Sequence, residues 1–501
     1  MYDILIKNAT IIDGTGAPGY IGDVAVKAGK IAEIGTGLTD AKQVIDATGL
    51  MVSPGWIDSH SHSDSAILTH PDQQEKLEQG ITFSITGQCG GSAAPKMEDG
   101  KLLTAQAFFE QAAQTPQGSG SVMLVGHSNL RRVVMGTASR PATSEELAQM
   151  EQLLAESMEA GCIGLSMGLI YVPGLYATTE ELVALAKIVA KYDGILAAHI
   201  RGEGDTVEDS VSEFISIAEA AGCRGVISHF KATGKKNWHK LQENLDRVDA
   251  ANARGADIYL DVYPYIASHT SLASTFYPKQ FHGDGTVPAS KRLKDPALRQ
   301  EVTQWCRERW GDDMSWVLLT NCEKRKDLIG KTVAEAAELD GKDVYEEMWD
   351  LICDGYATGC FFSQSEDNVD IALAHPRAMV CTDSGVAKGR THFHPRLRGA
   401  FPRVLGRLVR ERKIVSLPEM IRKMTSLPAC VYGLPTKGKI AVGMDADLCV
   451  FNADTIIDGS DYVNCTLPNK GLAYVLVDGK IVVECNAYNG TRAARVITKK
   501  C

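Results

Sequence analysis

Thr178-Thr179-Glu180-Glu181 and Ile195-Leu196-Ala197-Ala198-His199 mark the start and the end of one unit that recurs through the middle of the chain. The first segment predicts a capping box and the start of a helix that runs to Tyr192-Asp193-Gly194. The second is a short apolar run of the kind that forms a buried strand. A helix followed by an apolar strand, repeated along a chain, predicts a parallel sheet in which the helices connect successive strands.

Similar units lie on both sides of this one. Each helical segment ends at a glycine, at Gly161, Gly222 or Gly255, and an apolar run follows. The strands predicted in this way are 162–166, 225–229 and 257–262, with later candidates at 316–320, 359–363 and 378–383. About eight such units favour an α/β fold with a closed TIM-like (β/α)8 barrel. No glycine-rich dinucleotide fingerprint follows an early strand, which also weighs against an open doubly wound sheet.

The two ends of the chain have a different pattern, with short alternating runs such as Asp3–Lys7 and Ala473–Val483. Such runs predict strands joined by tight turns. We therefore expect residues 1–54 and 437–501 to form one small β-sandwich domain, and residues 55–436 to form the barrel domain. Residues 276–315 interrupt the repeat and are rich in Lys, Arg, Pro and Trp, so we expect an insertion over the barrel mouth around residues 276–345.

Composition excludes several classes of protein. The chain has 501 residues, 44% hydrophobic and 23% charged, which is ordinary for a soluble globular protein. A net charge of −10 argues against nucleic acid or an anionic membrane as a partner and leaves a small molecule. No apolar run is long enough to span a membrane, and the N-terminus does not resemble a signal peptide. The 13 scattered cysteines contain no C-x-x-C pair and indicate reduced thiols in a cytoplasmic protein.

Metal-ligating residue types stand at the ends of the predicted strands. The segment Gly55-Trp56-Ile57-Asp58-Ser59-His60-Ser61-His62 places two histidines at i and i+2, which share one face of an extended chain. Other strand-like runs end at Cys89, His199, His229 and Asp383. Any of these alone has an ordinary structural explanation, but in a parallel barrel all of them reach the same rim. Six such donors fit two cations, one held by His60, His62 and Asp383 and the other by His199 and His229, with Cys89 reaching both. Nitrogen and thiolate donors favour Zn²⁺.

These residues resemble the D-aminoacylase branch, the N-acyl-D-amino-acid deacylases, of the amidohydrolase superfamily. The resemblance covers the whole chain. The segments that carry it are 6–16, 52–62, 87–90, 171–177, 198–201, 228–231, 394–396, 401–406 and 443–448. In this branch a cysteine takes the place of the carboxylated lysine that bridges the metals of most related enzymes, and Cys89 stands at that place. The resemblance further implies a tight zinc site at Cys89, His199 and His229 and a weaker second site at His60 and His62.

A carboxylate on the substrate calls for cationic and hydroxyl groups near the metals. Lys231 lies two residues after His229, on the same face if the strand continues. By resemblance, Arg396, Tyr263 and Ser268 are the other candidates, and Tyr171 is a candidate donor to the amide carbonyl. Each of these residues also has an ordinary packing or surface role as its alternative.

The chemistry expected of this set is metal-assisted hydrolysis of a linear amide. Asp383 is a candidate to take a proton from water and return it to the leaving amine, and one carboxylate can also serve as a ligand. The predicted products are a carboxylate and a free D-amino acid, with the D preference resting on resemblance. The segment Leu272–Pro278 contains no cation before Lys279, which favours neutral, apolar side chains.

Two alternatives remain open at this point. One is a related enzyme that hydrolyses cyclic amides or D-dipeptides, as hydantoinases and dipeptidases do, because metal ligands do not specify a substrate. The other is a non-catalytic scaffold that has kept the fold, but such a protein would be expected to lose ligands, and all six candidates are present here. Bound zinc would distinguish an enzyme from a scaffold.

Overall fold

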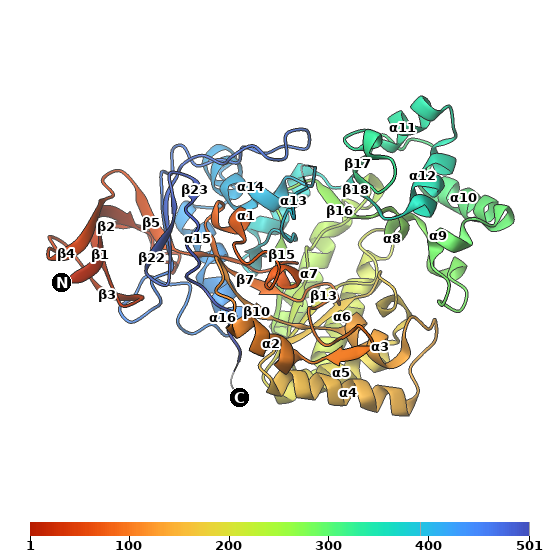
Figure 1. The fold of residues 1–501 in the computed structure, drawn as a ribbon, viewed down its shortest axis with the longest axis horizontal. Coiled ribbons are helices and arrows are strands. Elements are labelled where there is room, and N and C mark those ends of the chain that lie inside the picture. Colours follow the sequence, from red (N-terminus) through yellow and green to blue (C-terminus); the bar gives the residue numbers. More distant parts are fainter. Residues whose placement is uncertain (391, 500–501) are drawn as a thin grey trace.

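The barrel lies at the centre of the molecule, between a sheet domain and an insertion (Figure 1). This computed structural model describes residues 1–390 and 392–499. The barrel strands are β6 (Trp56–Asp58), β7 (Ile81–Thr86), β10 (Gly120–Met123), β11 (Val125–Gly126), β12 (Gly164–Gly168), β13 (Ile195–His199), β14 (Arg224–Ile227), β15 (Ile258–Val262) and β19 (Ala378–Val380). All their pairings with one another are parallel. The predicted (β/α)8 barrel is confirmed, with β10 and β11 together filling one strand position on either side of Leu124.

The barrel closes between its last strand, β19, and its first, β6. The Ser59 hydroxyl donates to the Val380 carbonyl at 2.9 Å, and Ser61 forms a parallel bridge with Ser384 just beyond the two strands. Segments more than 300 residues apart in the sequence are thereby brought together. The loops that follow β6 and β19 consequently meet at one rim.

Helices α4 (Ser144–Glu159), α5 (Thr179–Lys191), α6 (Val207–Ala221), α7 (Lys240–Ala253) and α13 (Glu366–Ala374) pack side by side around the strands. The expected helix start at Thr178 is present, because its hydroxyl accepts from the amide of Glu181. The other hydrogen bond of the predicted capping box, from the Thr178 amide to the Glu181 carboxylate, is absent. The Glu181 carboxylate instead pairs with Arg131 and His127, both buried on α3 (His127–Met135). The carboxylate thus has two side-chain partners, and its charge-assisted pair with the Arg131 guanidinium is stronger than a hydrogen bond to one backbone amide.

The remaining elements around the barrel are short. They are η1 (Asp64–Ala66), α1 (Gln74–Leu77), β8 (Lys96–Glu98), β9 (Lys101–Leu103), α2 (Ala105–Ala113), η2 (Gly174–Tyr176), η3 (Lys235–Asn237), α14 (Arg396–Arg403), the π-helical segment η6 (Val404–Glu411), α15 (Leu417–Met424) and α16 (Ser426–Val431).

The two chain ends form a single hydrogen-bonded sheet at the far left of Figure 1. Its strands are β1 (Tyr2–Ile11), β2 (Tyr20–Lys27), β3 (Lys30–Gly35), β4 (Ala41–Asp46), β5 (Met51–Pro54), β20 (Leu448–Phe451), β21 (Leu472–Val477), β22 (Lys480–Glu484) and β23 (Ala487–Tyr488). The junction is the antiparallel pairing of β5 with β20, one strand from each end of the chain. Apolar side chains of both ends, among them Ile6, Val52 and Leu448, share one buried core.

The last described residues leave this sheet and run along the barrel. Ala494 and Val496 form bridges with Gln117 and Ser121, next to and on β10. The amide of Lys499 then donates to the carbonyl of Gly161 at 2.9 Å. Residues 494–499 are thus anchored on the barrel.

An insertion separates β15 from β19. It contains β16 (Ala267–Ser271), α8 (Leu272–Phe276), η4 (Lys279–Phe281), α9 (Ala289–Arg292), α10 (Pro296–Trp310), β17 (Val317–Cys322), η5 (Lys326–Leu328), α11 (Val333–Asp340), α12 (Val344–Asp354) and β18 (Ala357–Phe362). The prediction of 316–320 and 359–363 as strands of the parallel repeat is wrong. These segments pair antiparallel with each other, and β16 pairs antiparallel with β18. Their short apolar runs resemble barrel strands because both kinds of strand are buried.

A buried ion pair lies beneath the closure of the barrel. The Lys76 ammonium donates to the Asp58 carboxylate at 2.7 Å, and both side chains are fully buried. Asp58 also accepts from the amide and the hydroxyl of Thr382 at 2.8 and 2.6 Å, and Lys76 reaches the carbonyl of Ser384 at 3.0 Å. This pair therefore fixes the backbone on both sides of Asp383. No helix in the described part of the chain is both long and apolar enough to cross a membrane.

The Lys76→Met variant should be less stable by about 3–5 kcal/mol, because it leaves the Asp58 carboxylate buried without its cation. The free energy of unfolding from urea denaturation measures the effect. Adding Asp58→Asn removes the uncompensated charge, so the double variant should be more stable than Lys76→Met alone. An unchanged unfolding midpoint for Lys76→Met would contradict this role for the pair.

Candidate metal centre

The six predicted ligands converge on one rim of the barrel. His60 and His62 follow β6, Cys89 follows β7, His199 ends β13, His229 follows β14 and Asp383 follows β19. Their donor atoms fall into two overlapping groups in which all atoms lie within 4.8 Å of one another. The first group is His60, His62, Cys89 and Asp383, and the second is Cys89, His199 and His229.

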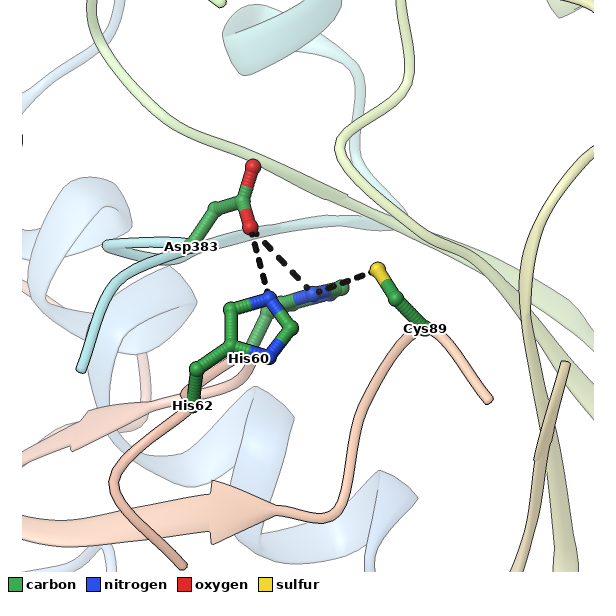
Figure 2. Close-up of side chains that lie close together, drawn as sticks. All are labelled: His60, His62, Cys89 and Asp383. Carbon is green, nitrogen blue, oxygen red and sulfur yellow. Dashed lines mark hydrogen bonds and ion pairs between the residues drawn. The ribbon is translucent and has the colours of Figure 1, made fainter. Parts of the chain in front are cut away.

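Figure 2 shows the first group, in which both imidazoles point toward the carboxylate. Asp383 Oδ1 lies 3.1 Å from His62 Nε2 and 3.5 Å from His60 Nε2. The Cys89 sulfur lies 3.4 Å from the same His60 nitrogen. One carboxylate oxygen, two imidazole nitrogens and one sulfur thus surround a common point, a donor set suited to a divalent transition metal.

The second group uses the other side of the Cys89 sulfur. Cys89 Sγ lies 3.4 Å from His229 Nε2 and 3.9 Å from His199 Nδ1. The two imidazole rings stand nearly perpendicular, at 72°, with their centroids 4.4 Å apart. Since Cys89 belongs to both groups, its sulfur occupies the position of a bridging ligand.

Three of these residues have unusual backbone conformations. Cys89, His229 and Asp383 have φ angles of 52°, 36° and 46°, in the left-handed region that few non-glycine residues adopt. Such conformations cost free energy and persist where the surrounding structure enforces them. Each occurs just after a barrel strand, where it turns the side chain inward over the rim.

Two carboxylates that the sequence analysis did not identify hold the outer nitrogens of the histidines. Asp261 on β15 accepts from His60 Nδ1 at 3.3 Å and from the backbone amide of His229 at 2.6 Å. Glu203 lies 2.9 Å from His229 Nδ1. Each contact leaves Nε2 free to bind a metal, as outer-sphere carboxylates do in many metal sites. Asp261 was detectable as an acid inside an apolar run, whereas Glu203 lies in a polar loop with no distinctive spacing.

The electrostatics of the cluster favour anionic ligands. Burial raises the pKa of the Cys89 thiol, but the neighbouring His60 and His229 outweigh this and hold that pKa well below its usual value. Burial likewise opposes ionisation of Asp383, yet Arg396 and the histidines keep the pKa of this carboxyl well below its ordinary range. A half-buried thiolate beside a buried carboxylate requires compensating positive charge, which a divalent cation supplies.

The candidate cations Lys231 and Arg396 both contact this cluster. Lys231 Nζ lies 2.5 Å from Glu203 Oε1 and 2.8 Å from His229 Nδ1. Arg396, at the start of α14, pairs with Asp383 Oδ2 at 2.8 Å. Both side chains are buried, and both line a cavity of about 700 Å³ that contains the donor atoms.

The three hydroxyl candidates differ in position. Tyr171 and Ser268 line the same cavity, and the Tyr171 hydroxyl lies 3.4 Å from that of Thr270. Tyr263 lies behind the wall, where its ring contacts Arg396 and Lys231 with 4.7 and 5.6 Å between charge and centroid. This position fits a residue that holds the two cations in place.

Comparison with known sequences identifies relatives that span the chain. A profile of the Amidohydrolase family matches residues 43–303 and 380–483. An N-acyl-D-glutamate deacylase of Alcaligenes xylosoxydans xylosoxydans is 35% identical over 95% of this chain and 93% of its own length. A D-aminoacylase of the same organism is 33% identical over 99% of this chain and 98% of its own length.

Solved structures of the same group superpose over the whole chain. An N-acyl-D-glutamate deacylase from Bordetella bronchiseptica, complexed with zinc and a phosphonate inhibitor, gives a TM-score of 0.87 at 32% identity and covers 99% of both chains. A D-aminoacylase structure gives 0.87 at 31% identity with full coverage of both chains. A D-hydantoinase gives 0.57 at 17% identity over 99% of both chains, which shows a common fold alone.

The Glu203→Gln variant should bind Zn²⁺ about 10–100-fold more weakly, because a neutral amide holds His229 less firmly than a carboxylate does. Competition with a chromophoric chelator measures the dissociation constant directly. Glu213→Gln is the matched control. Glu213 pairs with Arg201 at 2.9 Å and belongs to neither donor group. Equal zinc affinity in the two variants would show that Glu203 does not support the metal site.

Proposed function

The chain belongs to the D-aminoacylase branch of the amidohydrolase family, and from this we propose that it is a zinc-dependent hydrolase of N-acyl-D-amino acids. The reaction converts the linear amide to a carboxylate and a free D-amino acid. One observation carries the proposal: the Cys89 sulfur is shared by two donor groups at the strand ends, with Asp383 beside it. A bridging cysteine distinguishes this arrangement from a site bridged by a carboxylated lysine.

The proposed tight zinc site consists of Cys89, His199 and His229, and the weaker second site uses His60 and His62 with Asp383. The N and S donors of both groups fit zinc. When bound, zinc supplies a nucleophilic water at neutral pH and polarises the amide carbonyl. One of the relatives bears on this assignment, because the Bordetella bronchiseptica deacylase was solved with zinc.

Asp383 is the proposed proton carrier. Its low pKa keeps it ionised at neutral pH and thus able to accept a proton from the attacking water. Its second oxygen is held by Arg396 at 2.8 Å, which fixes the orientation of the carboxylate relative to the donor atoms. The same carboxyl then delivers the proton to the leaving nitrogen, which departs as a neutral amine.

Lys231, Arg396 and Ser268 are the proposed partners of the substrate α-carboxylate, and the ring of Tyr263 positions the two cations from behind. The Tyr171 hydroxyl is the proposed donor to the amide oxygen. Burial raises the pKa of Tyr171 well above its ordinary value, so the phenol stays protonated and able to donate. Lys231, Arg396, Ser268 and Tyr171 line one cavity together with the donor atoms, as a single bound substrate requires.

We expect neutral, apolar D-side chains to be favoured. Ser274 and Thr275, in the segment between Leu272 and Pro278, face the cavity, and the segment carries no charge. An acidic side chain is the second candidate, and Arg390 is the observation in its favour. Arg390 lines the cavity, and its Nε atom donates to the Ala387 carbonyl at 3.2 Å rather than to a carboxylate. The names of the relatives include both D-glutamate and D-aspartate deacylases.

The deciding experiment is hydrolysis of N-acetyl-D-amino acids and their L enantiomers by the zinc-loaded protein, followed through amine release. The panel contains Leu, Met, Phe, Trp, Val, Glu and Asp. Turnover of the D forms alone is expected, with Leu, Met and Phe ahead of Glu and Asp. A preference for Glu or Asp would favour the second candidate. No turnover with zinc bound would overturn the proposal in favour of cyclic amides or D-dipeptides.

The Asp383→Asn variant should lose about 10²–10⁴-fold in kcat, the usual contribution of a general acid–base group. Its zinc content should remain at least one per chain, since Cys89, His199 and His229 are unaltered. Metal analysis together with steady-state kinetics tests both statements. A variant that keeps near wild-type kcat would exclude Asp383 as the proton carrier.

A further inference from the structure

The cavity extends well beyond the metal donors. At its inner end it is lined by His62, Cys89 and His199, and on the insertion side by Trp310, Trp316 and Phe361. Its volume of about 700 Å³ is in the middle of the range, roughly 300–1,000 Å³, that encloses drug-sized ligands. An N-acetyl amino acid with a small side chain would leave the outer part empty.

Aromatic rings form the outer wall. The centroids of Trp310 and Trp316 are 5.6 Å apart, and Trp316 lies 6.1 Å from Phe361. Phe276, fully buried, contacts all three from behind at 5.8–6.1 Å. Spacings of this size are those of stacked and edge-to-face aromatic pairs, which an additional aromatic ring can join.

The wall is held rigidly against the barrel. The insertion has its own hydrophobic core, in which Phe276, Phe361 and Trp349 are buried. Arg309, next to Trp310, pairs across the cavity rim with Asp205 of the barrel at 3.2 Å. The Arg309 guanidinium also stacks on Trp310 with 5.1 Å to the ring centroid. A preorganised wall loses little conformational entropy when a ligand binds.

The indole of Trp310 has an unused hydrogen-bond donor. Its Nε1 atom is buried and has no partner among the described residues. Buried indole N–H groups usually find an acceptor. Because this atom has no accessible surface, the wall presents apolar ring surface to a ligand in the cavity and not a hydrogen-bond donor.

We propose that the wall formed by Trp310, Trp316 and Phe361 binds an aromatic group of the substrate, so that the enzyme selects N-acyl-D-amino acids that carry an aryl substituent. This inference rests on the proposed function and specifies its substrate class. The aryl group can be carried by the acyl moiety or by the D-side chain, and the two sources share the same chemistry. The apolar ring of the substrate packs against the indole rings of the wall.

Two matched pairs of substrates, tested with the zinc-loaded protein, show whether the acyl group or the D-side chain carries the aryl ring. N-Phenylacetyl-D-alanine against N-acetyl-D-alanine tests the acyl group, and N-acetyl-D-phenylalanine against N-acetyl-D-alanine tests the side chain. We expect one pair to show KM lower by about tenfold or more for the aryl compound, the order expected for a ring buried among aromatic partners. Equal KM values within both pairs would overturn the inference and leave the proposed function intact.

Variants then assign the effect to the wall. Trp316→Ala and the milder Trp316→Leu should abolish the aryl preference, so that KM becomes equal for the aryl compound and its N-acetyl-D-alanine partner. Trp305→Ala is the matched control, because Trp305 stacks on Arg309 in the same helix but does not line the cavity. An aryl preference that survives in both Trp316 variants, or falls equally in Trp305→Ala, would contradict the assignment.

A direct binding measurement keeps this test independent of turnover. Calorimetry with phenylacetate and acetate, as stand-ins for the acyl group, and with D-phenylalanine and D-alanine needs no catalysis. Tighter binding of one aryl ligand, lost in Trp316→Leu, supports the wall even if no amide of the panel is hydrolysed. Equal binding within both pairs would refute it, whereas failure of the proposed function would appear only as absent hydrolysis.

Discussion

The Cys89 sulfur is the contact on which the rest of the site depends. It lies 3.4 Å from one nitrogen of His60 and 3.4 Å from one of His229, and so joins donor groups that come from opposite parts of the barrel rim. A thiolate at this half-buried point places negative charge where it is costly without a cation. The adjacent Asp383 adds a second negative charge. These charges favour a bound metal, and the left-handed backbone at Cys89 and Asp383 turns both side chains to this point of the rim.

Carboxylates behind the ligands complete the arrangement. Asp261 holds His60 and the backbone of His229, Glu203 holds His229 and Lys231, and Asp58 with Lys76 fixes the loop around Asp383. Each of them contacts a ligand or its backbone. Asp58 and Asp261 do so from outside the cavity, whereas Glu203 also lines it. Positioning of this kind determines which imidazole nitrogen faces the metal, a choice that the ligands alone leave open.

Fold and chemistry are separable in this protein. A hydantoinase shares the barrel and the sheet domain at 17% identity, whereas the deacylases share them at above 30% identity. The barrel supplies the rim on which ligands converge, and the residues placed there decide the reaction. The insertion adds a further wall to the site, because its aromatic residues line the outer end of the cavity.

The sequence alone was sufficient to predict the repeated strand–helix units. Parallel strands are buried on both faces and are therefore apolar throughout, whereas the helices show a periodic pattern of apolar residues. It was also sufficient to find the six ligand candidates, since residue type and position after a strand are both local properties. The same local signal failed for 316–320 and 359–363, because an apolar run does not reveal whether its partner is parallel or antiparallel.

Only the tertiary structure decided which distant residues meet. Barrel closure brings Asp383 to His62, 321 residues earlier in the chain, and places Asp261 behind His60 across 201 residues. Packing also places Tyr263 behind the cavity wall and makes Trp310 and Trp316 of the insertion part of that wall. The sequence thus determined the chemical types and their order along the chain. The distances between side chains, their hydrogen-bond partners and their exposure depended on packing among segments that lie far apart in the sequence.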